Sequence, residues 1–261
     1  MSRKFSISAG VETMFFGRNR IRLVGVDSTN NYAAELLRQY DITEGTLITA
    51  NYQTAGRGQR ANSWQSEPDK NVLCTYVLKP KFMPTNRQFT LNKLIALCVL
   101  KCIRSFCPNS NLHIKWPNDI YLDACKLSGI LIENTISGGQ IVSSLVGIGI
   151  NVNQMEMHVE GRKVTSMAAV LKHELVLEEV LNCLSAQLEA GYLLFRSGND
   201  RQIDAEYDAA LFKLNETCVY QSATGANVLV LRGVSKDGLL VLDDEAGNRK
   251  HFKHGEIWMV E

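Results

Sequence analysis

The stretch Gly147-Ile148-Gly149-Ile150-Asn151-Val152-Asn153 is the most informative in the chain, because glycine alternates with isoleucine along an apolar run. Such a run is typical of a β-strand that is largely buried. Glycines inside a strand often mark the close approach of a ligand or of another backbone. Asn151 is polar where the pattern predicts burial, so it needs hydrogen-bond partners. The stretch therefore predicts a sheet that carries a binding site.

Other runs rich in Ile, Leu and Val predict further strands in the same region of the chain. They cover residues 21–26, 46–52, 71–78, 113–116, 128–133 and 140–152. Helices are predicted where apolar residues recur at helical spacing. One such segment follows the candidate N-caps of residues 27–30. The others cover residues 85–106 and 164–212. The mixture predicts an α+β domain over residues 21–213.

The pattern changes near the C-terminus. Short apolar runs at residues 228–231, 238–242 and 256–260 are separated by Lys236-Asp237-Gly238 and Ala246-Gly247-Asn248, which are typical hairpin turns. Residues 214–261 are therefore predicted to form a second, small β-barrel domain. Residues 1–20 are predicted to be a weakly structured N-terminal extension, and residues 154–163 a polar loop.

Composition excludes several classes of protein. The 261 residues include 28 Lys+Arg and 27 Asp+Glu, a net charge of +1, so no basic field attracts nucleic acid. No apolar run is long enough to span a membrane, and the N-terminus lacks the apolar core of a signal peptide. The seven cysteines form no C-x-x-C pair and the five histidines no cluster, which argues against a structural metal. We expect a cytoplasmic protein with reduced thiols.

Residues 55–64 form the most unusual loop, in which Gly56 and Gly58 bracket Arg57 and in which Arg60 and Trp64 follow. Glycine lets backbone N–H groups approach an anion, and arginine adds a forked donor set that suits phosphate or carboxylate. The alternative for such a sequence is a solvated surface loop without a ligand.

Two further clusters follow predicted strands. Lys115-Trp116-Pro117-Asn118-Asp119 fits a hairpin turn with a buried tryptophan. Lys126 precedes the apolar run of residues 127–133, where a lysine either extends its charge to solvent or places it over a site at the end of the sheet.

The motifs occur in a fixed order along residues 21–155. They are Ser28-Thr29-Asn30, Gln53-Thr54-Ala55-Gly56-Arg57-Gly58 with Trp64, Lys115-Trp116-Pro117-Asn118-Asp119, Lys126-Leu127-Ser128-Gly129-Ile130-Leu131 and the stretch at residues 147–153. Together they resemble the motifs of the biotin protein ligases, and the C-terminal segment resembles the small SH3-like domain of that family.

This resemblance implies a fold and a reaction. The fold is a mixed-sheet catalytic domain related to lipoate ligases and class II tRNA synthetases. The reaction joins biotin to ATP, with Mg²⁺, to give biotinyl-5′-AMP and pyrophosphate. The biotin is then transferred to a lysine of a biotin carboxyl carrier protein domain. Oligomeric state is left open, with a homodimer as one alternative.

The resemblance also assigns roles to residues. Catalysis falls to Lys126, Arg57 and Arg60, with Lys126 between the biotin carboxylate and the α-phosphate. The positions that correspond to biotin contacts are Ser28, Thr29, Asn30, Gln53, Gly56, Gly58, Trp64, Lys126 and Gly129. Those for the nucleotide are Arg57, Gln59, Arg60, Trp64, Asn118, Lys126, Asn151 and Asn153. Asp119 is the candidate ligand for Mg²⁺.

The chain departs from the family at Gln59, where relatives often carry a second arginine that contacts the phosphate of the adenylate. The hypothesis is that Arg60 or Arg57 compensates; otherwise the adenylate would escape.

Some relatives also carry an N-terminal DNA-binding helix-turn-helix. Only about 20 residues precede the first predicted strand, too few for that unit, so we expect no DNA binding. A lipoate or octanoate ligase and a non-catalytic biotin-binding adaptor are the alternative functions.

Overall fold

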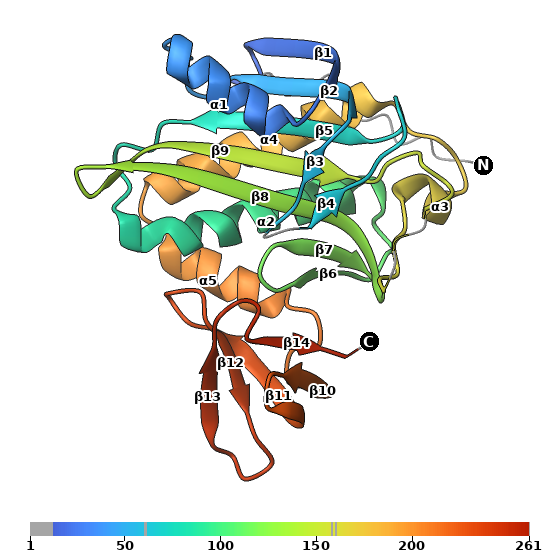
Figure 1. Ribbon diagram of the computed structural model, residues 1–261, viewed down its shortest axis with the longest axis vertical. Coiled ribbons are helices and arrows are strands. Elements are labelled where there is room, and N and C mark those ends of the chain that lie inside the picture. Colours follow the sequence, from blue (N-terminus) through green and yellow to red (C-terminus); the bar gives the residue numbers. More distant parts are fainter. Residues whose placement is uncertain (1–12, 60–61, 158, 160, 261) are drawn as a thin grey trace.

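A seven-stranded sheet forms the centre of the larger domain (Figure 1). The computed structural model describes residues 13–59, 62–157, 159 and 161–260. The strand order is β1-β2-β5-β9-β8-β7-β6, and only β1 and β2 are parallel, so the sheet is mixed. The strands are β1 (Arg20–Val26), β2 (Leu47–Gln53), β5 (Val72–Leu78), β6 (Leu112–Lys115), β7 (Asp119–Leu122), β8 (Cys125–Ser137) and β9 (Gln140–Ile150).

Helices cover both faces of this sheet (Figure 1). One face carries α1 (Thr29–Gln39), and the other carries α2 (Gln88–Phe106), which packs against α4 (Leu177–Arg196) and α5 (Asp200–Ala209). A 3₁₀ turn, η1 (Thr85–Arg87), precedes α2, and the short α3 (Met167–Leu171) precedes α4. The segment at residues 164–212, predicted to be helical, is thus divided into α3, α4 and α5. No helix of the described residues is both long and apolar enough to cross a bilayer.

Alternation along the strands decides which side chains enter the core. Tyr76 of β5 points into the main core between the sheet and α2 and α4, whereas Val77 belongs to the smaller cluster beneath α1. Thr75 also faces α1 and is fully buried. On β9, Ile148 lies in the main core, so the neighbouring Gly147 and Gly149 face the α1 side. The candidate site lies on this second face.

Strand β7 was not predicted, because Pro117 and Asn118 indicate only the turn before it. β7 pairs with β8 through an irregular register: Asp119 lies opposite Gly129, while Tyr121 lies opposite Lys126. This bulge breaks the simple alternation, so Leu127 enters the core and Lys126 lies next to Gly129 on the α1 side. Bulges commonly redirect a side chain beside a functional site.

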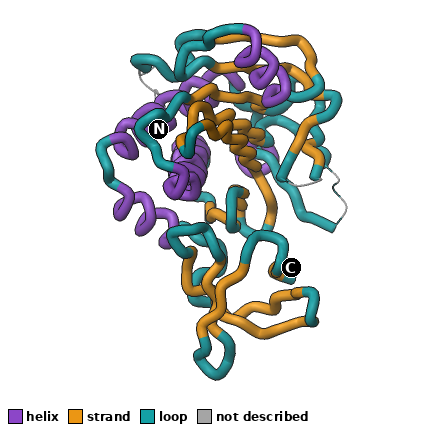
Figure 2. The backbone as a smooth tube through the Cα atoms, turned by 60° about the vertical axis from the view of Figure 1, so that its left-hand side comes forward, coloured by secondary structure: helices purple, strands orange, loops and turns teal. Residues whose placement is uncertain are grey.

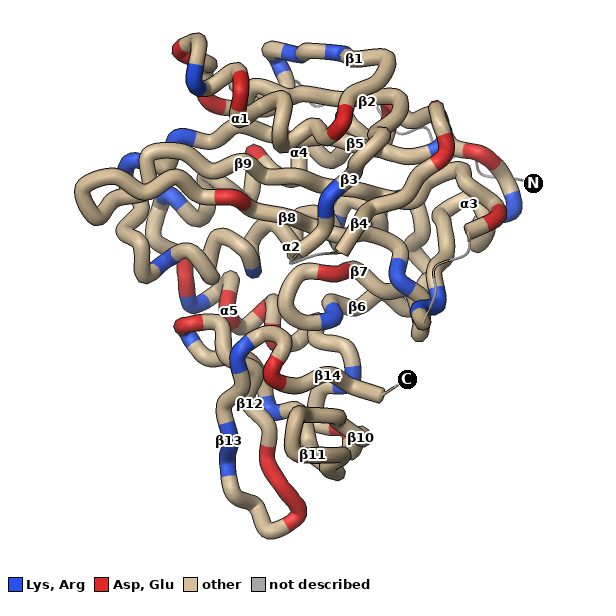
Figure 3. Tube along the Cα trace, in the orientation of Figure 1, with Lys and Arg blue, Asp and Glu red and all other residues tan. Residues whose placement is uncertain are grey.

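The C-terminal strands form a separate lobe next to α5 (Figures 1 and 2). Their antiparallel order is β13-β12-β11-β10-β14. The strands are β10 (Thr217–Ser222), β11 (Gly225–Val234), β12 (Leu240–Asp243), β13 (Arg249–Phe252) and β14 (Ile257–Met259). The polar strands β10 and β13 were not predicted, since apolar runs indicate only the others. Basic and acidic positions are interspersed along the whole trace (Figure 3), in keeping with the net charge of +1.

The N-terminal prediction is wrong for the described residues 13–20. Phe16 is fully buried in the main core, and β1 begins at Arg20. The carboxylate of Glu189 on α4 accepts the backbone N–H groups of Met14, Phe15 and Phe16 at 2.7, 2.8 and 3.1 Å. Residues 1–12 lie outside the described residues.

Replacing Glu189 by alanine should lower the free energy of unfolding by about 2 kcal/mol, because a charged acceptor of several N–H groups is lost. Burial alone would raise the pKa of Glu189, but these N–H groups outweigh it, and the pKa lies below its usual value. The stabilisation should therefore be present above the unfolded-state pKa of the carboxyl and be lost as pH falls through its folded-state pKa. Urea titrations across that pH range measure both effects.

The exposed Glu245→Ala, on a hairpin turn, is the matched control and should change stability by less than about 0.5 kcal/mol. Equal stabilities for the Glu189 and Glu245 variants would contradict the anchoring role of Glu189.

Candidate active site

A cavity of about 300 Å³ lies on the α1 side of the sheet, over β8 and β9. The loop between β2 and β5 covers it, through the hairpin of β3 (Gly56–Arg57) and β4 (Ser63–Trp64). Its volume is at the lower end of the range for small-molecule sites. The residues brought together here include most of the predicted set: Ser28, Thr29, Asn30, Gln53, Arg57, Gly58, Gln59, Trp64, Asn118, Asp119, Lys126, Gly129 and Asn151.

One end of the cavity is polar and tightly connected. Gln53 Oε1 accepts hydrogen bonds from the backbone N–H and the hydroxyl of Thr29, at 2.8 and 3.1 Å. Thr75 donates its hydroxyl to Asn30 Oδ1 at 2.6 Å. Ser28 is the N-cap of α1, yet its side chain makes no capping hydrogen bond. This end therefore presents both donors and acceptors on side chains that are already fixed.

The middle of the cavity is built from Trp64 and two glycines. A Cβ atom at Gly149 would lie 2.5 Å from the Trp64 ring, and one at Gly129 would lie 3.0 Å from it. The indole thus rests on the sheet where two paired strands lack side chains. Its Nε1 is buried without a hydrogen-bond partner. A buried donor of this kind is rarely left unpaired, which is consistent with a ligand acceptor nearby.

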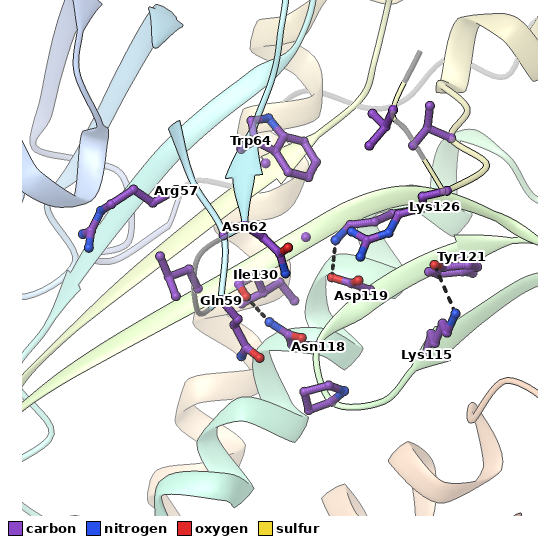
Figure 4. Close-up of a pocket in the computed structure, with 18 of the residues that line it drawn as sticks. Arg57, Gln59, Asn62, Trp64, Lys115, Asn118, Asp119, Tyr121, Lys126 and Ile130 are labelled. Carbon is purple, nitrogen blue, oxygen red and sulfur yellow. Dashed lines mark hydrogen bonds and ion pairs between the residues drawn. The ribbon is translucent and has the colours of Figure 1, made fainter. Parts of the chain in front are cut away.

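The other end of the cavity is cationic. Lys126 Nζ lies 2.6 Å from Asp119 Oδ1, and the two side chains are only 12% and 21% exposed (Figure 4). The amine of Lys115 lies over the ring of Tyr121, 4.8 Å from its centroid. The pKa of Lys115 is lowered to about 8, chiefly by burial; Asp119 opposes this effect, and the nearby charges of Arg162 and Lys126 add to it. Cations thus outnumber carboxylates at this end.

The predicted arginines are not all placed at this cationic end. Arg57 pairs with Glu133 at 2.6 Å, and its guanidinium points away from Lys126 (Figure 4). Gln59 lines the cavity beside Asn118 (Figure 4). Arg60 lies outside the described residues. A contact of Arg57 or Arg60 with phosphate stays a prediction.

The predicted asparagines and Gly56 differ in their placement. Asn118 donates its amide to the backbone carbonyl of Ile130, and Asn151 donates to that of Thr165 at 3.1 Å. Both line the cavity, and Asn151 is buried with partners, as predicted. Asn153 and Gly56 are absent from the described lining: Asn153 bonds both backbone groups of Leu175, and a Cβ at Gly56 would meet the Trp64 backbone.

Several residues at or next to the cavity were not among the predicted ones. Tyr121 and Arg162 lie at the cationic end, and Thr75 and Glu133 hold residues of the polar end in place. The C-terminal domain also contributes, through Tyr220, Leu231, Leu240, His254, Ile257, Trp258 and Met259. One signal in the sequence could have found Thr75 and Glu133. Side chains alternate between the two faces of the sheet along β5 and β8, and this alternation places both residues on the face that carries the site.

Comparison with known proteins agrees with this geometry. Residues 24–151 match the model of the biotin/lipoate A/B protein ligase family. The chain is 27% identical over 232 residues to the biotin–[acetyl-CoA-carboxylase] ligase of Paracoccus denitrificans, which covers 87% of this chain and 95% of that relative. It is also 27% identical to the bifunctional ligase/repressor BirA of Bacillus spizizenii, over 94% of this chain and 76% of that protein.

A solved structure agrees as well. The biotin protein ligase from Aquifex aeolicus in complex with biotin and ATP superposes with a TM-score of 0.77 at 26% identity, and the match covers 94% of this chain and 99% of that one. The chain is thus similar to the biotin/lipoate A/B protein ligase family over residues 24–151, and to a biotin protein ligase structure over 94% of its length.

Replacing Gly149 by alanine should displace the Trp64 ring, because the new methyl group would overlap it. Such overpacking costs about 1–3 kcal/mol. In a background where Trp116 and Trp258 are phenylalanine, the emission of Trp64 should shift to the red and be quenched more readily by acrylamide.

The matched control is Gly25→Ala, where a Cβ would meet nothing closer than 4.0 Å. Unchanged Trp64 emission in the Gly149 variant would show that the indole does not rest on this glycine.

Proposed function

We propose that this protein is a biotin protein ligase: it joins biotin to ATP to form biotinyl-5′-AMP and transfers the biotin to a lysine of a biotin carboxyl carrier protein domain. The observation that supports this proposal is the sequence of polar, aromatic and cationic side chains from one end of the cavity to the other. The polar end near Thr29 and Gln53 suits the ureido group, which needs both donors and acceptors. The indole of Trp64 suits the apolar ring and chain, and Lys126 suits the carboxylate.

In the first step a carboxylate oxygen of biotin attacks the α-phosphorus of ATP, and the bond from that phosphorus to the bridging oxygen breaks to release pyrophosphate. Two anions must be held together, so charge stabilisation is the main requirement. Lys126 is the cation best placed for it, since it lies at the cavity beside Gly129. Its present partner, Asp119, is a carboxylate that the substrate anions would replace.

The remaining phosphate contacts are proposed for Lys115 and Arg162, with Gln59, Asn118 and Asn151 toward the nucleotide. Arg162 comes from the polar loop at residues 154–163, so that loop would contribute to enclosing the adenylate. Arg162 is thus a third candidate, besides Arg57 and Arg60, for the charge that Gln59 lacks.

Mg²⁺ is usually held by one or two carboxylates together with substrate phosphates, where it neutralises their charge. Within the described part of the chain no group of three or more His, Cys, Asp and Glu side chains surrounds a common point. Asp119 is the carboxylate at the cationic end. The residues therefore fit an ion that is bound chiefly by ATP, with Asp119 as its protein ligand.

In the second step the amine of the acceptor lysine attacks the acyl carbon of biotinyl-5′-AMP, and AMP leaves. The acceptor belongs to the partner, so no nucleophile is required from this chain. The C-terminal domain, which we propose to be SH3-like and to comprise residues 214–261, contributes Trp258 and Met259 to the lining of the cavity. We further propose that the protein acts in the cytoplasm.

Pyrophosphate release with ATP and Mg²⁺ tests the activity directly. We expect release to depend on biotin and to be negligible with lipoate or octanoate. Release that depends on lipoate or octanoate would favour the alternative ligase. No release with any of these acids would favour a non-catalytic adaptor.

Replacing Lys126 by alanine should slow adenylate formation by at least about a hundredfold, as expected for loss of a charged transition-state contact. The rate is read as pyrophosphate release in a single turnover. Lys236→Ala, on an exposed turn, is the control and should retain the wild-type rate. Because the Lys126 variant leaves Asp119 unpaired, the Lys126→Ala/Asp119→Asn double variant separates folding from chemistry. Near-normal turnover in the double variant would remove Lys126 from the mechanism.

Replacing Gln59 by arginine tests whether the chain holds its adenylate as firmly as relatives with two arginines. If Arg162 or another cation compensates, the Gln59→Arg variant should release free biotinyl-5′-AMP at the wild-type rate, and Arg162→Ala should release it faster. Chromatography of the filtrate measures both rates. Slower release in Gln59→Arg than in the wild type would show that the wild-type site is weakened at this position.

A further inference from the structure

Glu133 joins two parts of the site that are far apart in the sequence. Its Oε2 accepts a hydrogen bond from Asn30 Nδ2 at 2.8 Å and pairs with the guanidinium of Arg57 at 2.6 Å. Asn30 belongs to α1 and Arg57 to the hairpin that covers the cavity. A single carboxylate oxygen of β8 thus links the first helix, the sheet and the covering loop.

Glu133 is itself held in place through Asn30. The Asn30 side chain is 3% exposed, and its Oδ1 accepts the hydroxyl of Thr75 at 2.6 Å. It also lies against Gly147, where any side chain would overlap it. The Asn30 amide therefore has one orientation available, with its N–H toward Glu133, and the Glu133 oxygen is presented to Arg57 from a fixed position.

The Arg57 side chain faces acidic groups on this side of the loop. Besides Glu133, Asp27 lies close enough for Arg57 to contribute to its lowered pKa, although the hydrogen bond from Asn31 is the larger cause. Both Arg57 and Glu133 are about 40% exposed, at 40% and 37%. The pair is therefore accessible to competing ions, and its worth is modest rather than that of a buried ion pair.

The hairpin of β3 and β4 links the Arg57 ion pair to the indole of Trp64 in the cavity. Within it Arg57 lies opposite Ser63, and Gly56 lies opposite Trp64. A contact that fixes the Arg57 side chain also fixes the strand that carries the indole, which rests on Gly149. Glu133 is not among the residues proposed to contact the reacting groups. Its effect on the substrate would therefore be transmitted through Arg57 and Trp64.

We propose that Glu133 is a positioning residue that holds the covering loop closed over the biotin site by its ion pair with Arg57. This proposal rests on the proposed function, because the loop that Glu133 holds covers the cavity proposed to bind biotin. Glu133→Gln keeps the size of the side chain and an oxygen for Asn30 but removes the charge. For a half-exposed pair the expected loss in loop closure is about fivefold.

The first test uses no substrate. Trypsin should cleave after Arg57 about fivefold faster in Glu133→Gln than in the wild type, as measured by mass spectrometry of the fragment that ends at Arg57. Glu35→Gln is the matched control, since Glu35 is an exposed glutamate that pairs with Arg38 on α1. An unchanged cleavage rate in Glu133→Gln, or an equal rise in the control, would overturn the proposal.

The second test is kinetic. The KM for biotin should rise about fivefold in Glu133→Gln with kcat within about twofold, and the same substitution should have no further effect in an Arg57→Ala background. A fall in kcat at unchanged KM, or additive effects of the two substitutions, would overturn the proposal while leaving the biotin ligase activity intact. A wild type without biotin-dependent turnover would instead overturn the proposed function, and the cleavage rates would still report whether Glu133 holds the loop.

Discussion

The absence of side chains at two paired positions, Gly129 on β8 and Gly149 on β9, is the constraint on which the site depends. The antiparallel register places these glycines side by side on the face away from the main core, and the Trp64 ring fills the space above them. A neighbouring glycine, Gly147, makes the equivalent space for Asn30, so the same strand admits both the first helix and the covering loop.

The charged side chains near Gly129 and Gly149 form two ion pairs, one at each end of the cavity. At one end Lys126 and Asp119 form a largely buried pair, and at the other Glu133 and Arg57 form a more exposed one. In the proposed reaction, substrate anions would compete with Asp119 for Lys126, whereas the guanidinium of Arg57 is directed at Glu133. The first pair is thus proposed to act on the reacting groups and the second on the shape of the cavity. The sequence prediction has Arg57 and Lys126 act together on phosphate, and for Arg57 that contact stays a prediction.

The sequence predicted the mixed sheet and most of its strands, and most of the predicted site residues line the cavity, because alternation and short motifs are local signals. It missed β7 and the bulge that brings Lys126 beside Gly129, since pairing register depends on a partner strand and not on one segment. Glu133 and Thr75 were missed for a similar reason: their partners Arg57 and Asn30 are brought to them by the fold. Asn153 was assigned to the nucleotide by its motif, yet both ends of its amide bond the backbone of Leu175.

Transfer of biotin to a carrier domain tests the central claim most directly. The protein is incubated with ATP, Mg²⁺, biotin and a biotin carboxyl carrier domain, and the acceptor lysine is examined by mass spectrometry beside a carrier in which that lysine is arginine. We expect one added biotinyl group on that lysine, dependent on both ATP and biotin. A carrier that stays unmodified in the complete reaction, or that gains a lipoyl group in its place when lipoate is supplied, would contradict it.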